Sequence, residues 1–574
     1  MSILIPILLV GAVMGIAFTG EVAPVQAAVP ERERIVAFDG EDAPPGVGAY
    51  LKGVVADLDG LPGTALNAYL QALAEDPDNM DLRQRTLDLA LMAGDIPNAI
   101  RLARSLPATE QSTMTRLVRV ADAAREGRVA EGRKLARDVG KVAPELLQFR
   151  LLQVYLDYAD GVAVPQLIAW LDTDGLPPSL SGRRNYHVAR LWLKAGEPEK
   201  ALDALRVAAE AEPGSVATTL LLGETLARQG RPGEGAAVLE SFRASHPSIA
   251  ALVPPGATLL DGMPRPFAST LDEDLASVMS DFGLLVWSQG AYGPARQVLN
   301  LALWLNPADV HTRYYTGMLL EMGGDYAAAV THYKVLTGRD VPDGVRLAAT
   351  IRLAEVQFQN GEQDQAWASL RALEREHAAE PNLLRSLAQL AYARNEFGRA
   401  AGYYSRLLAE MPPETPVAAR LEVLFARGVA YERNGQIEKA SADMMSALLI
   451  DPAQAQILNY LGYMWVDNGM NIEQAFELLQ KAHTLEPHDG AITDSLGWAY
   501  YKRGQYERAL AYLQRATEQE PESPEIYDHL GDAYAKLGNT GQAQLEWQRA
   551  LDLVTEGKEA PNKDFVRQVR RKLR

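Results

Sequence analysis

The sequence predicts an all-α fold in which helical hairpins stack into a solenoid. A glycine recurs at a nearly constant interval, and the residues around it repeat one order of large, small, aromatic and proline positions. Gly428, Gly462, Gly497 and Gly531 are 34, 35 and 34 residues apart. A period of this length is typical of one helical hairpin per repeat, in which each repeat buries its apolar face only against its neighbours. We therefore expect the array, and not any single repeat, to be the folding unit.

The repeat at residues 494–521 carries the pattern most completely. Its first helix is expected to contain Leu496, Gly497 and Tyr500, because a glycine lets a neighbouring helix approach closely while the larger side chains fill the space beside it. Gly504 is expected to end this helix in a left-handed conformation. The second helix is expected to present small residues to the helix crossing and to be ended by a proline, and these residues are Ala509, Ala516 and Pro521.

In this order of residues the chain resembles the tetratricopeptide repeat family, whose repeats are 34 residues long. Four consecutive repeats match well, and their further pattern residues are Ala440, Met444, Ala447, Pro452, Ala482, Pro487, Tyr527, Leu530, Tyr534, Ala543 and Ala550. Fainter matches occur within residues 53–77, 192–213 and 290–307. The resemblance implies an α-solenoid, a right-handed superhelix of about 13–14 hairpins.

Changes in composition divide the chain into segments. Residues 1–27 are predicted to be a signal peptide or an N-terminal membrane anchor, and residues 28–45 an extended lead-in. Prolines and glycines that forbid a continuous helix pair mark an interruption at residues 250–271. The remaining segments are a degenerate N-terminal array at 46–249, a middle array at 272–414, a C-terminal array with the best-matching repeats at 415–555, and a basic amphipathic capping tail at 556–574.

The N-terminal segment favours export. Residues 1–20 carry no charge, and Val25 and Ala27 follow as a signal-peptidase site requires. No basic residue precedes the apolar run, so an uncleaved anchor stays open as an alternative, because about twenty residues span a bilayer. A buried core helix is the third alternative. The expected location is the bacterial periplasm, with the protein either free or anchored to the membrane.

Composition and motifs argue against several function classes. The net charge of −18 repels nucleic acid phosphates. The absence of cysteine removes disulfides, thiolate metal sites and cysteine nucleophiles. The sequence has no phosphate-binding glycine loop, no serine nucleophile elbow and no His-Glu-x-x-His pair, and no two of its eight histidines have the spacing that aligns metal ligands on one helix face. We therefore expect no catalytic residue, no cofactor and no metal.

The resemblance implies that the free face of each first helix lines a concave groove that binds partners. On that face the chain places aromatic anchors beside an acidic flank, and the predicted partner-binding residues are Asn459, Tyr463, Asp494, Trp498, Tyr501, Asp528 and Asp532. This favours a peptide or protein partner with basic and apolar residues. Two alternatives stay open: the aromatic side chains fill space between repeats, or the aspartates form a solvated acidic face.

Two further surfaces rank lower. Trp287, His311, Tyr314 and Met318 are expected on first-helix faces of adjoining repeats, without an acidic flank. At the end of the chain, Phe565, Val569 and Leu573 are four residues apart, with arginines between and beside them. This tail is expected to cap the last repeat, and binding to anionic lipid or to an acidic partner is the alternative.

Together these observations predict a non-enzymatic scaffold of the bacterial cell envelope that assembles a complex by binding peptides or proteins in its groove. An accessory subunit of a polysaccharide synthesis or export system is an alternative from another class. A cryptic enzyme is a third. The sequence names neither the partner nor the oligomeric state.

Overall fold

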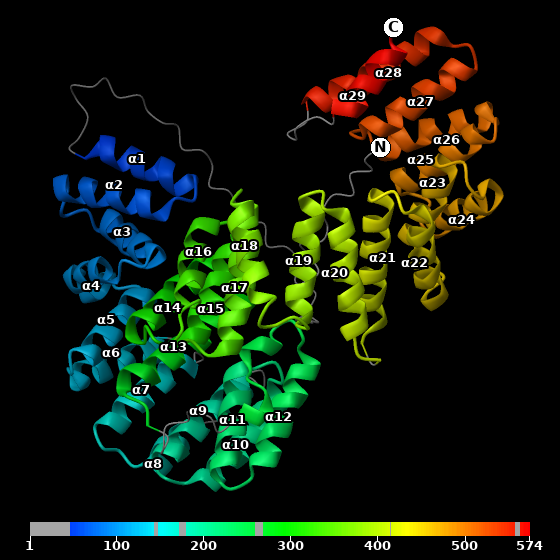
Figure 1. Cartoon of the computed structure of the whole chain (residues 1–574). Helices are drawn as coiled ribbons and strands as arrows, with labels where there is room; N and C mark the ends of the chain where they lie inside the picture. Colours follow the sequence, from blue (N-terminus) through cyan, green and yellow to red (C-terminus); the bar gives the residue numbers. More distant parts are fainter. Residues whose placement is uncertain (1–45, 143–146, 172–179, 259–267, 414, 557–562) are drawn as a thin grey trace. The chain divides into compact units, whose positions relative to one another are not determined.

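The computed structural model describes residues 46–142, 147–171, 180–258, 268–413, 415–556 and 563–574 (Figure 1). The predicted signal or anchor segment and the lead-in lie outside these residues. Within the described residues the secondary structure consists of α-helices and short 3₁₀ helices, and no strand is present. The predicted all-α fold is therefore confirmed. None of the helices in this part of the chain has the length and apolarity that crossing a membrane requires.

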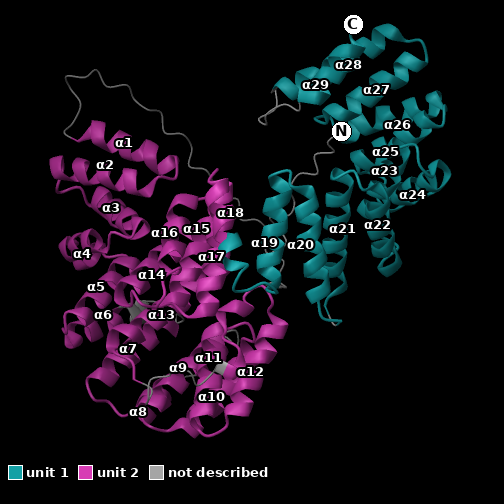
Figure 2. Cartoon of the chain, viewed as in Figure 1, with its two compact units in different colours: residues 1–13, 370–574 teal, residues 14–369 magenta. Residues whose placement is uncertain are grey.

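The described residues divide into two compact units, one ending at Ser369 (unit 2) and one running from Leu370 to Arg574 (unit 1), as Figure 2 shows. The boundary lies within α18, inside the segment predicted as the middle array. The helices of unit 2 are α1 Val47–Leu58, α2 Pro62–Glu75, α3 Met80–Ala93, α4 Ile96–Ser105, α5 Thr113–Arg125, α6 Val129–Val142, α7 Leu147–Ala159, α8 Val164–Leu171, α9 Ser181–Lys194, α10 Pro198–Ala211, α11 Val216–Arg228, α12 Pro232–Ser245, α13 Leu271–Ser288, α14 Tyr292–Leu305, α15 Val310–Met322, α16 Tyr326–Val335 and α17 Asp343–Gln359, with α18 Gln363–Leu373 at its end.

Unit 1 continues the same pattern of helices. They are α19 Pro381–Ala393, α20 Phe397–Glu410, α21 Val417–Arg433, α22 Ile437–Ile450, α23 Ala455–Asp467, α24 Ile472–Leu485, α25 Gly490–Lys502, α26 Tyr506–Gln519, α27 Pro524–Lys536, α28 Thr540–Glu556 and α29 Lys563–Lys572. Consecutive helices pack as hairpins, such as α23 with α24, α25 with α26 and α27 with α28. The first helices α23, α25 and α27 also contact one another in order, which places them side by side.

The repeat at residues 494–521 shows why these residues form hairpins. A Cβ atom on Gly497 would lie 2.9 Å from Cγ of Leu513 on the second helix, so only glycine permits this close crossing. Gly504 follows the first helix with φ of 75°, the left-handed conformation that glycine adopts at little cost. Ala509 and Ala516 are fully buried. The roles predicted for these residues are confirmed.

In unit 2 the chain returns to its own first hairpins. The described parts of residues 250–271 lead from α12 to α13, and α13 and α14 then pack against α3, α5 and α7. The Gln297 side chain donates to the Asp88 carbonyl at 3.1 Å, and the Asn300 side chain donates to the Leu91 carbonyl at 2.8 Å. These contacts join residues about two hundred positions apart, so they are a property of the tertiary fold and not of one repeat.

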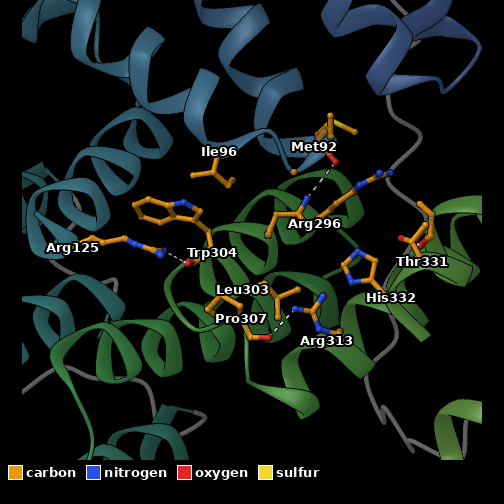
Figure 3. Close-up of a pocket in the computed structure, with 14 residues that line it drawn as sticks. Met92, Ile96, Arg125, Arg296, Leu303, Trp304, Pro307, Arg313, Thr331 and His332 are labelled. Atoms are coloured by element: carbon orange, nitrogen blue, oxygen red, sulfur yellow. Dashed lines mark hydrogen bonds between the residues drawn. The ribbon is translucent and has the colours of Figure 1, made fainter. Parts of the chain in front are cut away.

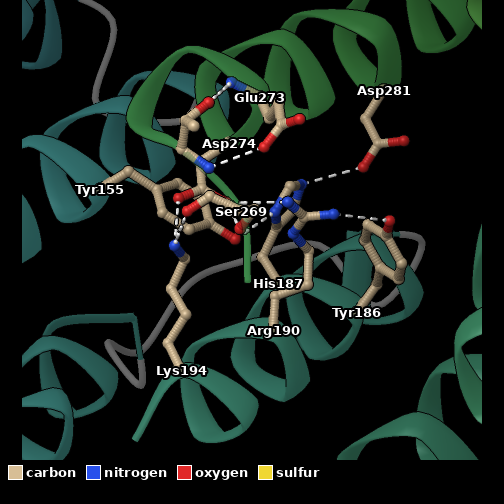
Figure 4. Close-up of polar contacts among 10 residues, drawn as sticks. Tyr155, Tyr186, His187, Arg190, Lys194, Ser269, Glu273, Asp274 and Asp281 are labelled. Atoms are coloured by element: carbon tan, nitrogen blue, oxygen red, sulfur yellow. Dashed lines mark hydrogen bonds and ion pairs between the residues drawn. The ribbon is translucent and has the colours of Figure 1, made fainter. Parts of the chain in front are cut away.

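Buried charges hold α13 in this position (Figure 4). Asp274 near the start of α13 accepts hydrogen bonds from Arg190 Nη2 at 2.8 Å and from the Ser269 hydroxyl at 2.7 Å, and Lys194 Nζ lies 2.8 Å from its second oxygen. Two turns further along α13, Asp281 lies 2.9 Å from Nε2 of His187. Arg190, Lys194 and His187 all come from α9, the first helix of its hairpin. This face of α9 is therefore occupied by the same chain.

Candidate partner-binding surface of unit 1

The seven predicted partner-binding residues lie on α23, α25 and α27, which we call the first-helix surface of unit 1. α23 carries Asn459 and Tyr463, and the other five are divided between α25 and α27. Direct packing of α23 on α25 and of α25 on α27 brings the seven residues into one region. The sequence prediction that these residues lie together thus has a geometric basis, but their environments differ.

Trp498 is packed and not projecting. Its indole ring lies between the Tyr501 ring, with centroids 4.6 Å apart and an interplanar angle of 6°, and the His529 ring, at 4.2 Å and 15°. The Lys502 ammonium lies 5.0 Å from the indole centroid. The side chain is 8% exposed, and its Nε1 atom has no hydrogen-bond partner among the described residues. Trp498 therefore fills space between repeats and also keeps one buried donor unsatisfied.

Asp494 and His529 form a buried pair across α25 and α27. The two carboxylate oxygens of Asp494 lie 2.9 and 3.0 Å from Nδ1 of His529. Burial acts to lower the pKa of His529, but the attraction of Asp494 outweighs it and raises the pKa above its ordinary value, with smaller contributions from Asp528 and Asp532. The sequence prediction did not include His529 in the site. A spacing of one repeat separates the two residues, and this spacing is the signal that points to their contact.

The acidic flank is paired within the chain. Lys572, on the last turn of α29, places Nζ 2.8 and 2.9 Å from the two oxygens of Asp528 and 2.7 Å from Oδ1 of Asp532. The indole Nε1 of Trp547 also donates to Asp532, at 3.2 Å. Burial raises the pKa of Asp528, Lys572 acts to lower it, and the neighbouring Asp532 raises it further. Of the predicted flank, Asp528 is therefore buried and paired with Lys572, not solvated.

The described part of the tail lies against the last hairpin. Val569 is fully buried, and Phe565 and Leu573 are partly buried in a cluster with Trp547 and Tyr534. The apolar stripe predicted from the four-residue spacing is thus turned toward α27 and α28, and Lys572 fixes the end of α29 on them. Residues 557–562 of the predicted tail lie outside the described residues.

Asn459 and Tyr463 complete the surface on α23. Asn459 is 9% exposed, and its side-chain oxygen has no hydrogen-bond partner among the described residues. Tyr463 is 8% exposed, and its ring lies 6.4 Å from that of His529. Burial raises the pKa of Tyr463 well above its ordinary value, and the nearby carboxylates act in the same direction. Tyr501 on α25 is only half-buried and is the most accessible aromatic ring of the predicted set.

The lower-ranked surface is part of the core of unit 2. Tyr314 is 3% exposed, and burial raises its pKa to about 12. Nε2 of His311 lies 3.2 Å from the Leu252 carbonyl oxygen. Trp287 and Met318 pack against buried clusters. These residues therefore pack in the interior of unit 2. This agrees with the lower rank given to them as a candidate binding surface.

The pair between Asp494 and His529 makes the stability of unit 1 depend on pH. Because the pKa of His529 is raised in the folded state, its contribution is fully present below the unfolded pKa of about 6.5 and is lost as the pH rises through the folded pKa. We expect unit 1 to be more stable against urea at about pH 6 than at about pH 8.5. Hydrogen exchange of α25 and α27 at the two pH values measures this difference.

The matched control for this measurement is His488→Gln, because His488 is exposed and lies in the same unit. The His529→Gln variant should lose the difference between the two pH values, whereas the control should keep it. A pH dependence of equal size in both variants contradicts the assignment to His529.

Comparisons with known proteins agree with the repeat pattern. Models described as tetratricopeptide or TPR repeats match residues 186–250, 351–415, 421–454 and 497–538, and the resemblance predicted from the sequence is confirmed. A TPR repeat-containing protein of Pseudomonas aeruginosa is 35% identical over 85 residues. The match covers 15% of this chain and 14% of that protein, so the chain aligns with a small part of its relative.

Several solved structures are similar to parts of the chain. A tetratricopeptide repeat protein from Parabacteroides merdae is 17% identical, with 46% of this chain and 98% of that chain covered and a TM-score of 0.39. A chain of the APC/C hetero-tetramer Cut9–Hcn1 is 12% identical. The match covers 81% of this chain and 97% of that chain, with a TM-score of 0.35. YrrB, a TPR protein described as having an unusual peptide-binding site, is 19% identical. The match covers 35% of this chain and 97% of that chain, with a TM-score of 0.26.

Proposed function

We propose that this chain, which carries tetratricopeptide repeats over the four matched ranges, is a scaffold that binds a partner peptide or protein on the first-helix surface of unit 1. Stacked helical repeats expose long continuous faces, and such faces serve recognition of extended partners. The observation that carries the proposal is a pair of buried, unsatisfied polar atoms on adjacent first helices. They are Nε1 of Trp498 on α25 and Oδ1 of Asn459 on α23.

An unsatisfied buried donor or acceptor costs about 1–3 kcal/mol, so natural proteins rarely keep one without a reason. Here one atom is a donor and the other an acceptor. A peptide backbone offers both a carbonyl and an N–H group in each residue. A partner segment lying along α23 and α25 therefore satisfies both atoms, and half-buried Tyr501 is the side chain whose displacement opens one face of the indole.

Charge favours a partner with basic residues. Carboxylates outnumber the basic groups around the surface, and the two sets are Asp467, Asp494, Glu525, Asp528 and Asp532 against Lys502, His529 and Lys572. A field of this sign raises the association rate of a cationic partner and weakens at high salt. Apolar residues of the partner would lie against Tyr501 and Trp498, as buried aromatic rings contribute most to binding energy.

The setting that we propose is the bacterial cell envelope, with the protein exported to the periplasm and either free or anchored by its N-terminal segment. The support is the uncharged apolar run of residues 1–20 and the absence of cysteine. We further propose that the protein acts by binding and not by catalysis. Cell fractionation with sequencing of the mature N-terminus tests the location, and an intact N-terminus on soluble cytoplasmic protein contradicts it.

A photocrosslinking residue identifies the partner directly. Lys502 is exposed beside Trp498, and Leu58 of α1 is 82% exposed in the other unit, so the two positions serve as probe and control. A crosslinker at position 502 should capture one partner from living cells that a crosslinker at position 58 does not. Capture from position 58 alone contradicts the placement on unit 1.

With the partner in hand, Trp498→Phe tests the proposed contact. The variant keeps an aromatic ring between Tyr501 and His529 but removes the indole N–H, and we expect the affinity to fall about tenfold, the value of one hydrogen bond of about 1.4 kcal/mol. Trp170→Phe is the control, because Trp170 is 40% exposed in unit 2. Equal affinities of the two variants and the wild-type protein, measured by calorimetry, would exclude this surface as the binding site.

A further inference from the structure

A cavity in unit 2 has a lining unlike the rest of this acidic chain. Its volume is about 460 Å³, within the range of sites for small molecules. Figure 3 shows its walls, which come from α14, α15 and α16 on one side and from the turn between α3 and α4, with the end of α5, on the other. Three arginines and one histidine line it, and none of the described residues in its wall is a carboxylate, in a protein with 74 acidic and 56 basic residues.

The return of α14 onto the first hairpins creates this cavity. The Asn300 side chain, part of the wall, donates to the carbonyls of Leu91 at 2.8 Å and of Met92 at 3.3 Å. Gly94, in the facing turn, adopts φ of 76°, which suits glycine, and so places that turn beside Asn300. The two walls are thus fixed to each other by hydrogen bonds, and the cavity is a built feature of unit 2.

One end of the cavity gathers cationic groups. Figure 3 shows His332 between Arg296 and Arg313. Nη1 of Arg296 lies 3.0 Å from Asp325, whereas its Nε has no hydrogen-bond partner among the described residues. Nη2 of Arg313 donates to the Pro307 carbonyl at 2.8 Å. No carboxylate within ion-pair distance of Arg313 is recorded in the described part of the chain, and burial lowers its pKa.

The carboxylate nearest to Arg313 in the sequence, Asp309, already accepts other hydrogen bonds. The Asp309 carboxylate accepts hydrogen bonds from the backbone N–H groups of His311 and Thr312 at 3.0 and 3.1 Å and from the Thr312 hydroxyl at 2.7 Å. It therefore caps the N-terminus of α15. Burial lowers the pKa of Arg313, and the charge of Asp309 offsets only part of this effect. The guanidinium of Arg313 therefore retains donors and positive charge for another acceptor.

His332 supplies a third polar group at the same end. Its Nδ1 atom is buried and has no hydrogen-bond partner among the described residues. Burial lowers the pKa of His332 to about 4, and the charges of Arg313 and Arg296 act in the same direction. The imidazole is therefore neutral near pH 7 and carries one N–H that can donate to an anionic oxygen.

The other end of the cavity has an aromatic ring, the third guanidinium and apolar side chains. The Arg125 guanidinium lies 4.3 Å from the centroid of the Trp304 ring and donates to the Trp304 carbonyl oxygen. Trp304 is half-buried, and Ile96 and Leu303 extend the apolar wall. A ligand that spans the cavity thus meets the Trp304 ring, with Arg125 stacked on it, and apolar side chains at one end, and two guanidinium groups with an imidazole at the other.

We propose that this cavity binds a small phosphate monoester with an aromatic or apolar substituent. Two arginines and an imidazole N–H match the three terminal oxygens of a phosphate dianion, since guanidinium groups bind phosphate through paired donors. The substituent lies against Trp304. Because Arg125 and the turn of Gly94 belong to hairpins far from α14 in sequence, the ligand also holds the returning helices in place and stabilises unit 2.

Calorimetry on the full chain with three probes tests the assignment. Phenyl phosphate should bind with a Kd of about 1 mM or tighter, inorganic phosphate more weakly because it lacks the ring, and benzoate more weakly because it carries one charge. Phenyl phosphate should also raise the unfolding temperature of unit 2. Binding of inorganic phosphate as tight as that of phenyl phosphate overturns the role of Trp304, and no saturable binding of any probe overturns the site.

Arg313→Gln should weaken phenyl phosphate binding about ten- to a hundredfold, the loss expected for charge-assisted hydrogen bonds. Arg339→Gln is the control, because Arg339 is exposed in the same unit and its loss changes the net charge equally. His332→Gln is a second variant, and phenyl phosphate should raise the pKa of His332 in the wild-type protein, as followed by NMR. Equal affinity of Arg313→Gln and the wild-type protein overturns the proposal.

Discussion

Asp274→Ala is expected to destabilise unit 2 by about 3–5 kcal/mol, the loss that follows when one partner of a buried ion pair is removed. Asp274 is 1% exposed and meets Arg190, Lys194 and the Ser269 hydroxyl at 2.7 to 2.8 Å. The side chains of Arg190 and Lys194 are 11% and 8% exposed. Without the carboxylate, two cations lie next to each other in a poorly solvated place, and their repulsion separates α13 from α9.

Urea unfolding combined with hydrogen exchange of α9 and α13 measures this loss. Asp203→Asn is the matched control, because Asp203 is 80% exposed and pairs only across the surface with Arg206, so its change is expected to stay within about 0.5 kcal/mol. Asp274→Asn should fall between the two, as it keeps the shape and one acceptor. A loss below about 1 kcal/mol for Asp274→Ala would show that packing alone holds α13.

The same network covers the corresponding first-helix face of α9 in unit 2. Counted back from the glycine that follows each helix, Gly196 and Gly504, Tyr186 and Arg190 on α9 occupy the positions of Asp494 and Trp498 on α25. On α9 the side chains of Arg190 and Lys194 contact Asp274 of α13, and His187 contacts Asp281 of the same helix (Figure 4). A first-helix face that binds its own chain has no room for a partner, so recognition on α9 is excluded by occupancy while α13 is in place.

Trp498→Ala is expected to destabilise unit 1 by about 3–5 kcal/mol, as is usual when a large buried aromatic side chain is truncated. The indole separates the rings of Tyr501 and His529, and both lose their stacking partner. The cavity left between α25 and α27 cannot close fully, because Asp494 holds His529 in position through Nδ1. Loss of partner binding in Trp498→Ala therefore does not by itself distinguish recognition from folding.

Circular dichroism and urea unfolding of Trp498→Ala, Trp498→Phe and Trp170→Ala separate the two effects. Trp498→Phe should cost much less stability than Trp498→Ala, because the ring stays in place. Trp170→Ala, at a position that is 40% exposed, should cost less than about 1 kcal/mol. A Trp498→Ala protein as stable as the wild type would show that the stacked arrangement of the three rings contributes nothing to the fold.

Much of the fold was predictable because its determinants are local and periodic. Gly497 and Gly504 have the roles that their spacing indicates, one at the helix crossing and one after the helix end. The seven site residues share a region because equivalent positions of stacked repeats lie side by side. One partner of these residues, Lys572, was not predictable in the same way. Lys572 meets Asp528 from 44 positions away, beyond the last repeat, and no period connects them.

The sequence by itself determined that the chain is helical and where its hairpins turn. It also determined which side chains share the first-helix surface, because residues three or four positions apart lie on the same face of a helix. Only the tertiary structure decided which of those faces are covered. It places α13 on α9 through Asp274 and Lys572 on the aspartates of α27. These choices depend on burial and on compensation of charge between distant segments, and such contacts leave no regular interval in the sequence.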